Sequence, residues 1–218
     1  ESTPDMSEYR RYYTNIVGKY GVQVKALLNK AQSLRISMIC PLHGLIWRKD
    51  IDNLIQKYAK WSAYEPEIKG VLIAYSSVYG NTQSAAEIVA NRLGEQGVKN
   101  IQMYDVSVTH PSYVVAEAFR YSHIVFATTT YNGGIFVTME NLLLDLKAHN
   151  LQNRTVALIE NGTWAATAAG QMKNILSSMK GMNVIANPVT LKSSVKPEKR
   201  DELIALADAI CETLKKRY

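Results

Sequence analysis

The chain has 218 residues, of which 47% are hydrophobic and 20% charged, a composition that excludes a disordered tail and allows one large domain or two ordinary ones. No apolar run approaches the roughly 20 residues of a membrane span. The net charge of +6 forms no concentrated basic stripe, so we expect neither a membrane nor a nucleic-acid partner.

Two cysteines lie far apart, at Cys40 and Cys211. This excludes a disulfide scaffold and fits a reducing compartment, so we expect a cytoplasmic protein. The first residues, ESTPDMSEYRRYY, contain no apolar segment of a signal peptide and no initial methionine. We therefore expect a processed chain or a fragment of a longer protein.

The first 66 residues contain too few elements for a sheet domain. Residues 6–34 predict one long helix with a weak point at Gly21, RISMIC (35–40) predicts a short strand, and residues 50–64 predict a second helix. We interpret residues 1–66 as the end of a domain whose beginning is missing. The boundary falls in EPE (65–67), where Pro66 interrupts regular structure. We also expect these helices to leave apolar surface exposed, around Tyr12, Tyr13, Val17 and Trp61.

From residue 69 to residue 218, apolar runs alternate with amphipathic stretches. Strands are predicted at residues 70–75, 100–106, 122–130, 155–160 and 182–188, and helices at 83–96, 111–120, 136–149, 164–180 and 197–216. Three of the runs are almost continuously apolar, which is typical of parallel strands covered on both faces. The alternation predicts an α/β domain with right-handed crossovers and a ligand site beyond the carboxyl ends of the strands.

A cluster of small polar residues, SSVYGNT (76–82), follows the first of these strands. The side chains of Ser77, Asn81 and Thr82 offer hydrogen-bond donors, and Gly80 allows a tight turn. Because a helix start presents unpaired N–H groups and the positive end of a dipole, a phosphate is the natural guest. An ordinary turn with a capped helix is the alternative.

The same turn excludes several phosphate chemistries. GxxxxGK[ST] and GxGxxG are both absent, so it is neither a nucleoside-triphosphate loop nor a dinucleotide fingerprint. It also lacks lysine and arginine. Hydroxyls and dipoles without a formal positive charge favour a permanently bound phosphate monoester over a transferred phosphoryl group.

Two later loops follow strand ends and belong on the same rim. TTTYNGGIF (128–136) and ENGTWAATAAG (160–170) each place one aromatic residue, Tyr131 or Trp164, among small residues and glycines. A flat ring system fits between two aromatics, with backbone N–H groups reaching its polar edge. A phosphate at one end and a flat ring at the other, without metal ligands, describe flavin mononucleotide (FMN). Core or surface packing is the alternative for either aromatic alone.

These motifs together resemble a known family. YSSVYGNT, TTTYNGG and NGTW resemble the three FMN loops of flavodoxin-type domains, and with CPLHGLIWR (40–48) they resemble the C-terminal part of the flavodiiron proteins. The resemblance implies a flavodoxin-like five-stranded parallel sheet of order 2-1-3-4-5 with helices on both faces. It makes residues 69–218 the FMN-binding domain and residues 1–66 the helix-strand-helix remnant of a metallo-β-lactamase-like di-iron domain.

The resemblance also implies which residues hold FMN. Side chains or backbone of Ser77, Tyr79, Asn81 and Thr82 contact the phosphate, with the N–H groups of Val78 and Gly80. The ribityl chain and one side of the ring lie against Thr129, Thr130, Tyr131 and Asn132, with Gly133 and Gly134 at the redox edge. The other wall consists of Asn161, Gly162, Thr163 and Trp164.

In the intact parent protein the resemblance implies that FMN passes electrons to a di-iron centre that reduces oxygen or nitric oxide. Rubredoxin or an NAD(P)H-dependent reductase donates the electrons, and the acceptor irons belong to a second subunit. His43 in PLHG corresponds to the last iron ligand, but the HxExDH cluster is absent. One imidazole cannot hold two irons, so we expect His43 to be an orphan ligand. We expect this chain to contain no catalytic residue and to act as an electron carrier.

Two other functions remain open on the sequence alone. The first is a free-standing flavodoxin-like NAD(P)H:quinone oxidoreductase, against which the truncated first 68 residues speak. The second is a cofactor-free interaction module that kept the fold.

Overall fold

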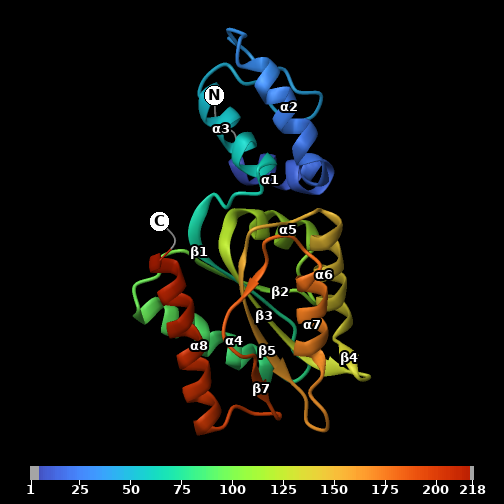
Figure 1. Cartoon of the computed structure of the whole chain (residues 1–218), viewed down its shortest axis with the longest axis vertical. Coiled ribbons are helices and arrows are strands. Elements are labelled where there is room, and N and C mark those ends of the chain that lie inside the picture. The colour runs from blue at the N-terminus through green and yellow to red at the C-terminus, as the bar shows by residue number, and fades with distance from the viewer. Residues whose placement is uncertain (1–4, 217–218) are drawn as a thin grey trace.

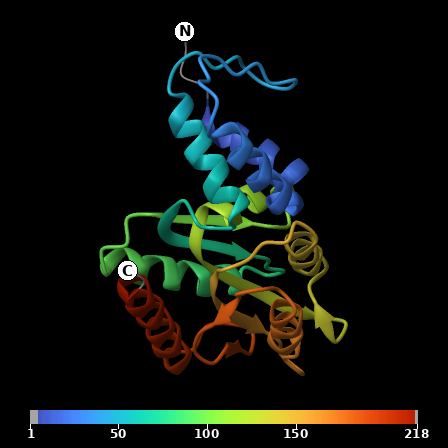
Figure 2. The ribbon, with the colours of Figure 1, turned by 45° about the horizontal axis from the view of Figure 1, so that its top comes forward.

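The structure is a computed structural model that describes residues 5–216. A parallel sheet forms its centre, with helices on both faces, and a group of N-terminal helices lies at one end of that sheet (Figure 1). Figure 2 shows the same helices projecting from the sheet domain as a separate layer.

Five parallel strands follow the order predicted for a flavodoxin-like sheet. The order is β2-β1-β3-β5-β6, with bounds β1 (Ile68–Tyr75), β2 (Ile101–Asp105), β3 (Tyr121–Tyr131), β5 (Thr155–Asn161) and β6 (Asn183–Val184). Two short strands are added: β4 (Gly134–Ile135) pairs antiparallel with β3, and β7 (Val189–Leu191) pairs parallel with β5. Of the fifth predicted strand, at 182–188, only Asn183–Val184 forms, and β7 begins just after its predicted end. Ala186, with a φ of 57°, interrupts the extended backbone between the two.

Each face of the sheet has its own set of helices (Figure 1). On one face, Leu72 and Ala74 belong to a core with α5 (Pro111–Arg120), α6 (Val137–Ala148) and α7 (Ala168–Ser177). On the other face, Val71 and Ile73 pack in a second core with α4 (Asn81–Glu95) and α8 (Pro197–Lys216). Successive side chains of a strand point to opposite faces, so β1 is apolar at every one of these positions.

The long N-terminal helix is interrupted. It consists of α1 (Met6–Tyr12), the π-helix η1 (Tyr13–Val17), the 3₁₀-helix η2 (Gly18–Tyr20) and α2 (Gly21–Ala31). Two glycines that pack against other parts of the chain, Gly18 and Gly21, flank the 3₁₀ turn, and the π-helix ends directly before Gly18. A Cβ on Gly18 would lie 3.2 Å from Phe119 Cζ, and one on Gly21 only 2.5 Å from the Ser62 carbonyl oxygen. The approach to a backbone oxygen at Gly21 requires glycine, whereas at Gly18 the Phe119 ring would have to shift by a few tenths of an ångström. The break lies just before the expected weak point.

The short strand predicted at 35–40 is not formed. A single antiparallel bridge joins Ile39 to Trp47, because no described neighbouring strand extends the pairing. The side chain of Tyr9 holds the loop instead, since its hydroxyl donates to the Leu45 carbonyl at 2.8 Å and accepts from the Leu45 N–H at 2.7 Å. Helix α3 (Ile51–Ser62) then follows close to the predicted bounds.

The apolar surface expected around the N-terminal helices is only partly present. Tyr13 and Trp61 are fully buried against each other, with ring centroids 5.2 Å apart, so this part of the expectation is wrong. Tyr12 remains exposed, as expected. The two aromatic rings fill the space between the helices instead of facing solvent.

A buried ion network joins the N-terminal helices to the sheet domain. Arg10 of α1 lies 3.3 Å from Glu67 and 2.9 Å from Glu117 of α5. Glu67, directly before β1, also accepts from the Trp61 indole N–H at 2.7 Å. The division of the chain at residue 66 stays a prediction, but residues on either side of it share this closed set of contacts.

Candidate functional site

Three loops that follow adjacent strands converge on one cavity. Strands β1, β3 and β5 are neighbours in the sheet and parallel, so their carboxyl ends open at the same edge. The cavity there has a volume of about 520 Å³. The predicted FMN residues line it except Gly80 and Gly134, and Ala165 and Ser193 complete the wall; the lining is Ser77, Val78, Tyr79, Asn81, Thr82, Thr129, Thr130, Tyr131, Asn132, Gly133, Asn161, Gly162, Thr163, Trp164, Ala165 and Ser193.

The start of α4 presents a series of free backbone donors to this cavity. The first helical hydrogen bond runs from the Ser84 N–H to the Gly80 carbonyl. The backbone N–H groups of residues 78–83 donate to no group within residues 5–216. Gly80 adopts a φ of 86°, which turns the loop into the helix. Successive free N–H groups at a helix start form an anion site.

One side chain in this loop has a buried polar atom without a partner. The Ser77 hydroxyl oxygen is inaccessible to solvent and makes no hydrogen bond in the structure. Its neighbour Ser76 contrasts with it, because its hydroxyl pairs with that of Thr128 at 2.7 Å. A buried polar atom without a partner costs free energy, so Ser77 fits a group that supplies an acceptor at this place.

The second helix start near the cavity has no such capacity. The Thr130 hydroxyl oxygen accepts from the N–H groups of Thr167 and Ala168 at 3.0 and 3.2 Å. The next N–H, of Ala169, donates to the Glu160 carboxylate at 2.7 Å. The first donors of α7 are therefore occupied by this chain's own side chains. Of these two helix starts, that of α4 has the unoccupied first N–H groups.

The cavity also carries an exposed aromatic ring on each of its three loops. Trp164 is 100% exposed, Tyr79 90% and Tyr131 47%. Rings of this size normally bury most of their surface, so their exposure around one cavity indicates a flat apolar ligand that covers them. Asn132 and Gly133 adopt φ values of 51° and 72° in the hairpin between β3 and β4. A Cβ on Gly133 would meet no atom within 4 Å, so the space in front of it is open.

Hydrogen bonds between the loops hold this hairpin. The Gly133 carbonyl accepts from the Thr167 hydroxyl at 3.0 Å and from the Gln171 side-chain amide at 2.8 Å. Across the cavity, the Thr82 and Thr129 hydroxyls lie 3.2 Å apart. The three loops are therefore fixed relative to one another before any ligand contacts them.

Two lining residues, Ala165 and Ser193, were missed by sequence reasoning, and Ser193 makes the contacts that fix the wall. Its N–H donates to the Asn161 side-chain oxygen at 2.9 Å, and its carbonyl accepts from the Asn161 amide at 2.9 Å. Its φ of 68° belongs to the left-handed region, where serine is uncommon. The only sequence signal was the pair of small polar residues Ser193 and Ser194 after an apolar run.

No charged side chain lines the cavity within residues 5–216. Tyr75, at the end of β1, stays protonated over a wider range than usual, because burial and then the Asp105 carboxylate raise the pKa of its hydroxyl. The site therefore holds a ligand through backbone dipoles, hydroxyls and apolar rings.

His43, the expected orphan iron ligand, lies in the exposed loop before α3. Its ring faces that of Tyr12 with centroids 5.5 Å apart. Among the described residues, no three histidine, cysteine or carboxylate side chains gather as a metal site. The expectation that His43 binds no iron in this chain stays a prediction.

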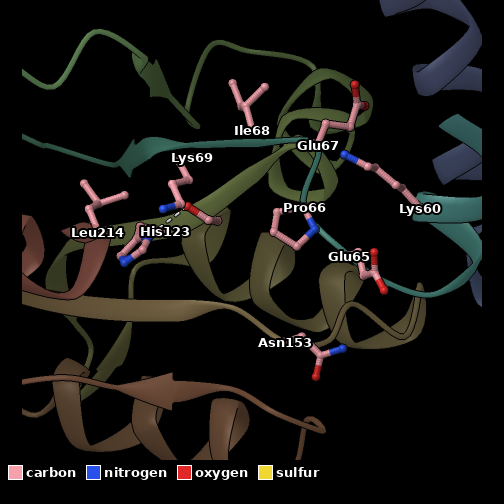
Figure 3. A pocket seen from close by; sticks show the side chains of 10 residues that line it. Lys60, Glu65, Pro66, Glu67, Ile68, Lys69, His123, Asn153 and Leu214 are labelled. Atoms are coloured by element: carbon pink, nitrogen blue, oxygen red, sulfur yellow. Dashed lines mark hydrogen bonds between the residues drawn. The ribbon is translucent and has the colours of Figure 1, made fainter. Parts of the chain in front are cut away.

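A second cavity, of about 590 Å³, opens at the opposite ends of the strands, beside the junction of α3 and β1 (Figure 3). Lys60, Glu65 and Lys69 give it charges of both signs. His123 on its wall is buried, with ring nitrogens 2.8 Å from the Ser122 hydroxyl and 3.1 Å from the Thr213 hydroxyl. This cavity lies at the amino ends of the strands, so it is not where a sheet of this type binds its ligand.

Comparisons with known proteins agree with the architecture. Residues 73–214 match the family described as flavodoxin. The nitric oxide reductase of Moorella thermoacetica is 28% identical over 185 residues, which are 84% of this chain and 46% of that protein. The chain thus spans about half the length of the curated relatives it matches. None of the helices among residues 5–216 has the length and apolarity needed to span a membrane.

Two solved structures share the fold over 96% of the chain. Rubredoxin oxygen:oxidoreductase from the anaerobe Desulfovibrio gigas has a TM-score of 0.88 at 24% identity, with 52% of that chain covered. The flavodiiron protein from Giardia intestinalis has a TM-score of 0.84 at 21% identity, with 53% covered. The predicted resemblance to the C-terminal part of the flavodiiron proteins is confirmed, and it includes the N-terminal helices.

Proposed function

The chain belongs to the flavodoxin family, and we propose from this premise that it binds FMN and acts as the electron-transfer module of a flavodiiron-type oxygen or nitric oxide reductase. One observation carries the proposal. The start of α4, whose N–H groups have no partner among residues 5–216, lies in the same pocket as the exposed rings of Tyr131 and Trp164. One anion and one flat ring are the two recognition elements of FMN.

The phosphate end is held by this chain's backbone. The N–H groups of residues 78–83 point their dipoles at the anion, and the hydroxyls of Ser77 and Thr82 donate to it. Both side chains are preorganised, since Thr82 is 1% exposed and the Ser77 hydroxyl oxygen is inaccessible to solvent. Because no lysine or arginine of the described part of the chain lines the cavity, the phosphate is bound as a fixed anchor and undergoes no reaction.

The ring end is held between the two aromatic loops. Tyr131 and Trp164 exclude water from the two faces of the ring, and the open space before Gly133 admits its edge. The bound flavin supplies the redox chemistry, and the protein sets its potential through stacking, backbone N–H groups and nearby charge. Asn161 and Ser193 keep the Trp164 loop attached to the β7–α8 loop.

Donor and acceptor lie outside this chain. The relatives that it matches have about twice its length, and they include a nitric oxide reductase and a rubredoxin oxygen:oxidoreductase. We assign the donor to a rubredoxin or an NAD(P)H-dependent reductase. The acceptor is a di-iron centre carried by a second subunit of the intact parent protein.

Titration of the purified chain with FMN tests the proposal, with riboflavin as the matched ligand that lacks the phosphate. Binding of FMN quenches flavin fluorescence, and the visible flavin bands disappear on reduction with dithionite. Riboflavin binds much more weakly, because it leaves the N–H groups of α4 unpaired. A colourless protein that FMN does not bind contradicts the proposal. Steady-state oxidation of NADH with a quinone would instead favour the quinone oxidoreductase.

A further inference from the structure

A carboxylate lies directly beneath the wall of the cavity without being part of its lining. Glu160 is the residue before Asn161 at the end of β5, and it is 7% exposed. One carboxylate oxygen accepts from the Ala169 N–H at 2.7 Å, and the other accepts from the Thr190 hydroxyl at 2.8 Å. The side chain therefore joins α7 and β7, the two elements that flank the Trp164 loop and the Ser193 loop.

Both contacts bring hydrogen-bond donors to this carboxylate, and one of them is a backbone N–H at the start of α7. The start of a helix stabilises negative charge nearby. No lysine, arginine or histidine side chain pairs with Glu160 in residues 5–216. Glu160 differs in this from the buried Glu67 and Glu117, which share Arg10 at the other edge of the sheet.

We propose that the buried carboxylate of Glu160 lowers the reduction potential of the flavin held in the neighbouring cavity. This inference rests on the proposed function. A fixed negative charge in a poorly polarisable environment opposes the arrival of electrons next to it. The cavity lining contains no charged side chain that would outweigh it. Glu160 acts through the electrostatic field of its carboxylate and through the loops that it holds. It is a positioning residue and contacts no reacting atom.

Two variants with opposite expected signs test the inference. Glu160→Gln keeps the shape and both hydrogen bonds, since its oxygen accepts from Ala169 and its amide donates to Thr190, but it removes the charge. Thr190→Val keeps the charge and removes one of its two donors. Each protein is loaded with FMN, and the midpoint potential of the bound flavin is measured at about pH 8, well above the ordinary range of a glutamate.

We expect E160Q to bind reduced FMN about tenfold better relative to oxidised FMN than the unaltered chain does, which raises the two-electron potential by about 30 mV. T190V is expected to shift the potential in the negative direction, because the carboxylate is less compensated. E160Q with bound FMN and an unchanged or lower potential overturns the inference and leaves the proposed function standing. If E160Q does not fold, an unchanged or raised potential in T190V overturns it. An unaltered chain that does not bind FMN overturns both.

Discussion

Replacing Ser77 by alanine should change stability and FMN affinity in opposite directions. The Ser77 hydroxyl oxygen is buried without a hydrogen-bond partner, and such an atom costs about 1–3 kcal/mol in the folded protein. S77A removes this cost, so the FMN-free protein should gain about 1 kcal/mol, or about 2–4 °C in Tm for a chain of this size. The same change removes a hydrogen bond to a charged phosphate, worth about 1.5–3 kcal/mol. The Kd for FMN should therefore rise roughly 10- to 150-fold.

Thermal unfolding without FMN and fluorescence titration with FMN measure the two effects. Ser76→Ala is the matched control, because the Ser76 hydroxyl is already paired with Thr128 at 2.7 Å. S76A should lose about 1 kcal/mol of stability and leave the FMN affinity nearly unchanged. The reasoning is refuted if S77A destabilises the FMN-free protein or binds FMN as tightly as the unaltered chain.

Four further predictions address the rest of the molecule. Thr82→Val should raise the Kd for FMN about tenfold through loss of a phosphate contact, and an unchanged Kd would argue against that contact. Arg10→Met should lower the free energy of unfolding in urea by about 2 kcal/mol, because two buried carboxylates each lose one cation while Lys57 and Arg120 still contact them; Lys199→Met, in an exposed pair, should change little, and equal effects would contradict the account. Hydrogen bonds from Arg92 lower the pKa of Asp208 from 3.8. The resulting stability is present above about pH 4 and lost below it, so the stability difference between the unaltered chain and Asp208→Asn should shrink on acidification through that range. Anoxic metal analysis should find no stoichiometric, tightly bound iron, since His43 belongs to no group of three potential metal ligands among residues 5–216; one iron per chain would refute this.

The sheet and the cavity at the carboxyl ends of its strands could be predicted because they depend on local sequence patterns. Continuous apolar runs such as Val71 to Ala74 are buried on both faces, and each is followed by a loop whose composition marks a turn. The N-terminal part was harder to predict. Whether RISMIC pairs as a strand depends on a partner strand, and only the Ile39–Trp47 bridge is formed.

Contacts between distant residues account for what sequence reasoning missed at the site. From the sequence, Glu160 is simply the end of a strand. The structure shows that its carboxylate accepts from the Ala169 N–H at the start of α7 and from the Thr190 hydroxyl. This N–H of α7 is therefore occupied, in contrast to the N–H groups at the start of α4. Ser193 follows β7, whose separation from β6 depends on the left-handed conformation of Ala186. The burial of Arg10 likewise depends on Glu117, 107 residues away.

A crystal structure of the chain with FMN tests the central claim most directly. The account predicts the phosphate within hydrogen-bond distance of the backbone N–H groups of residues 78–83, and the ring between Tyr131 and Trp164. A phosphate placed at α7 or in the cavity beside His123, or a ring outside the two aromatics, would contradict it.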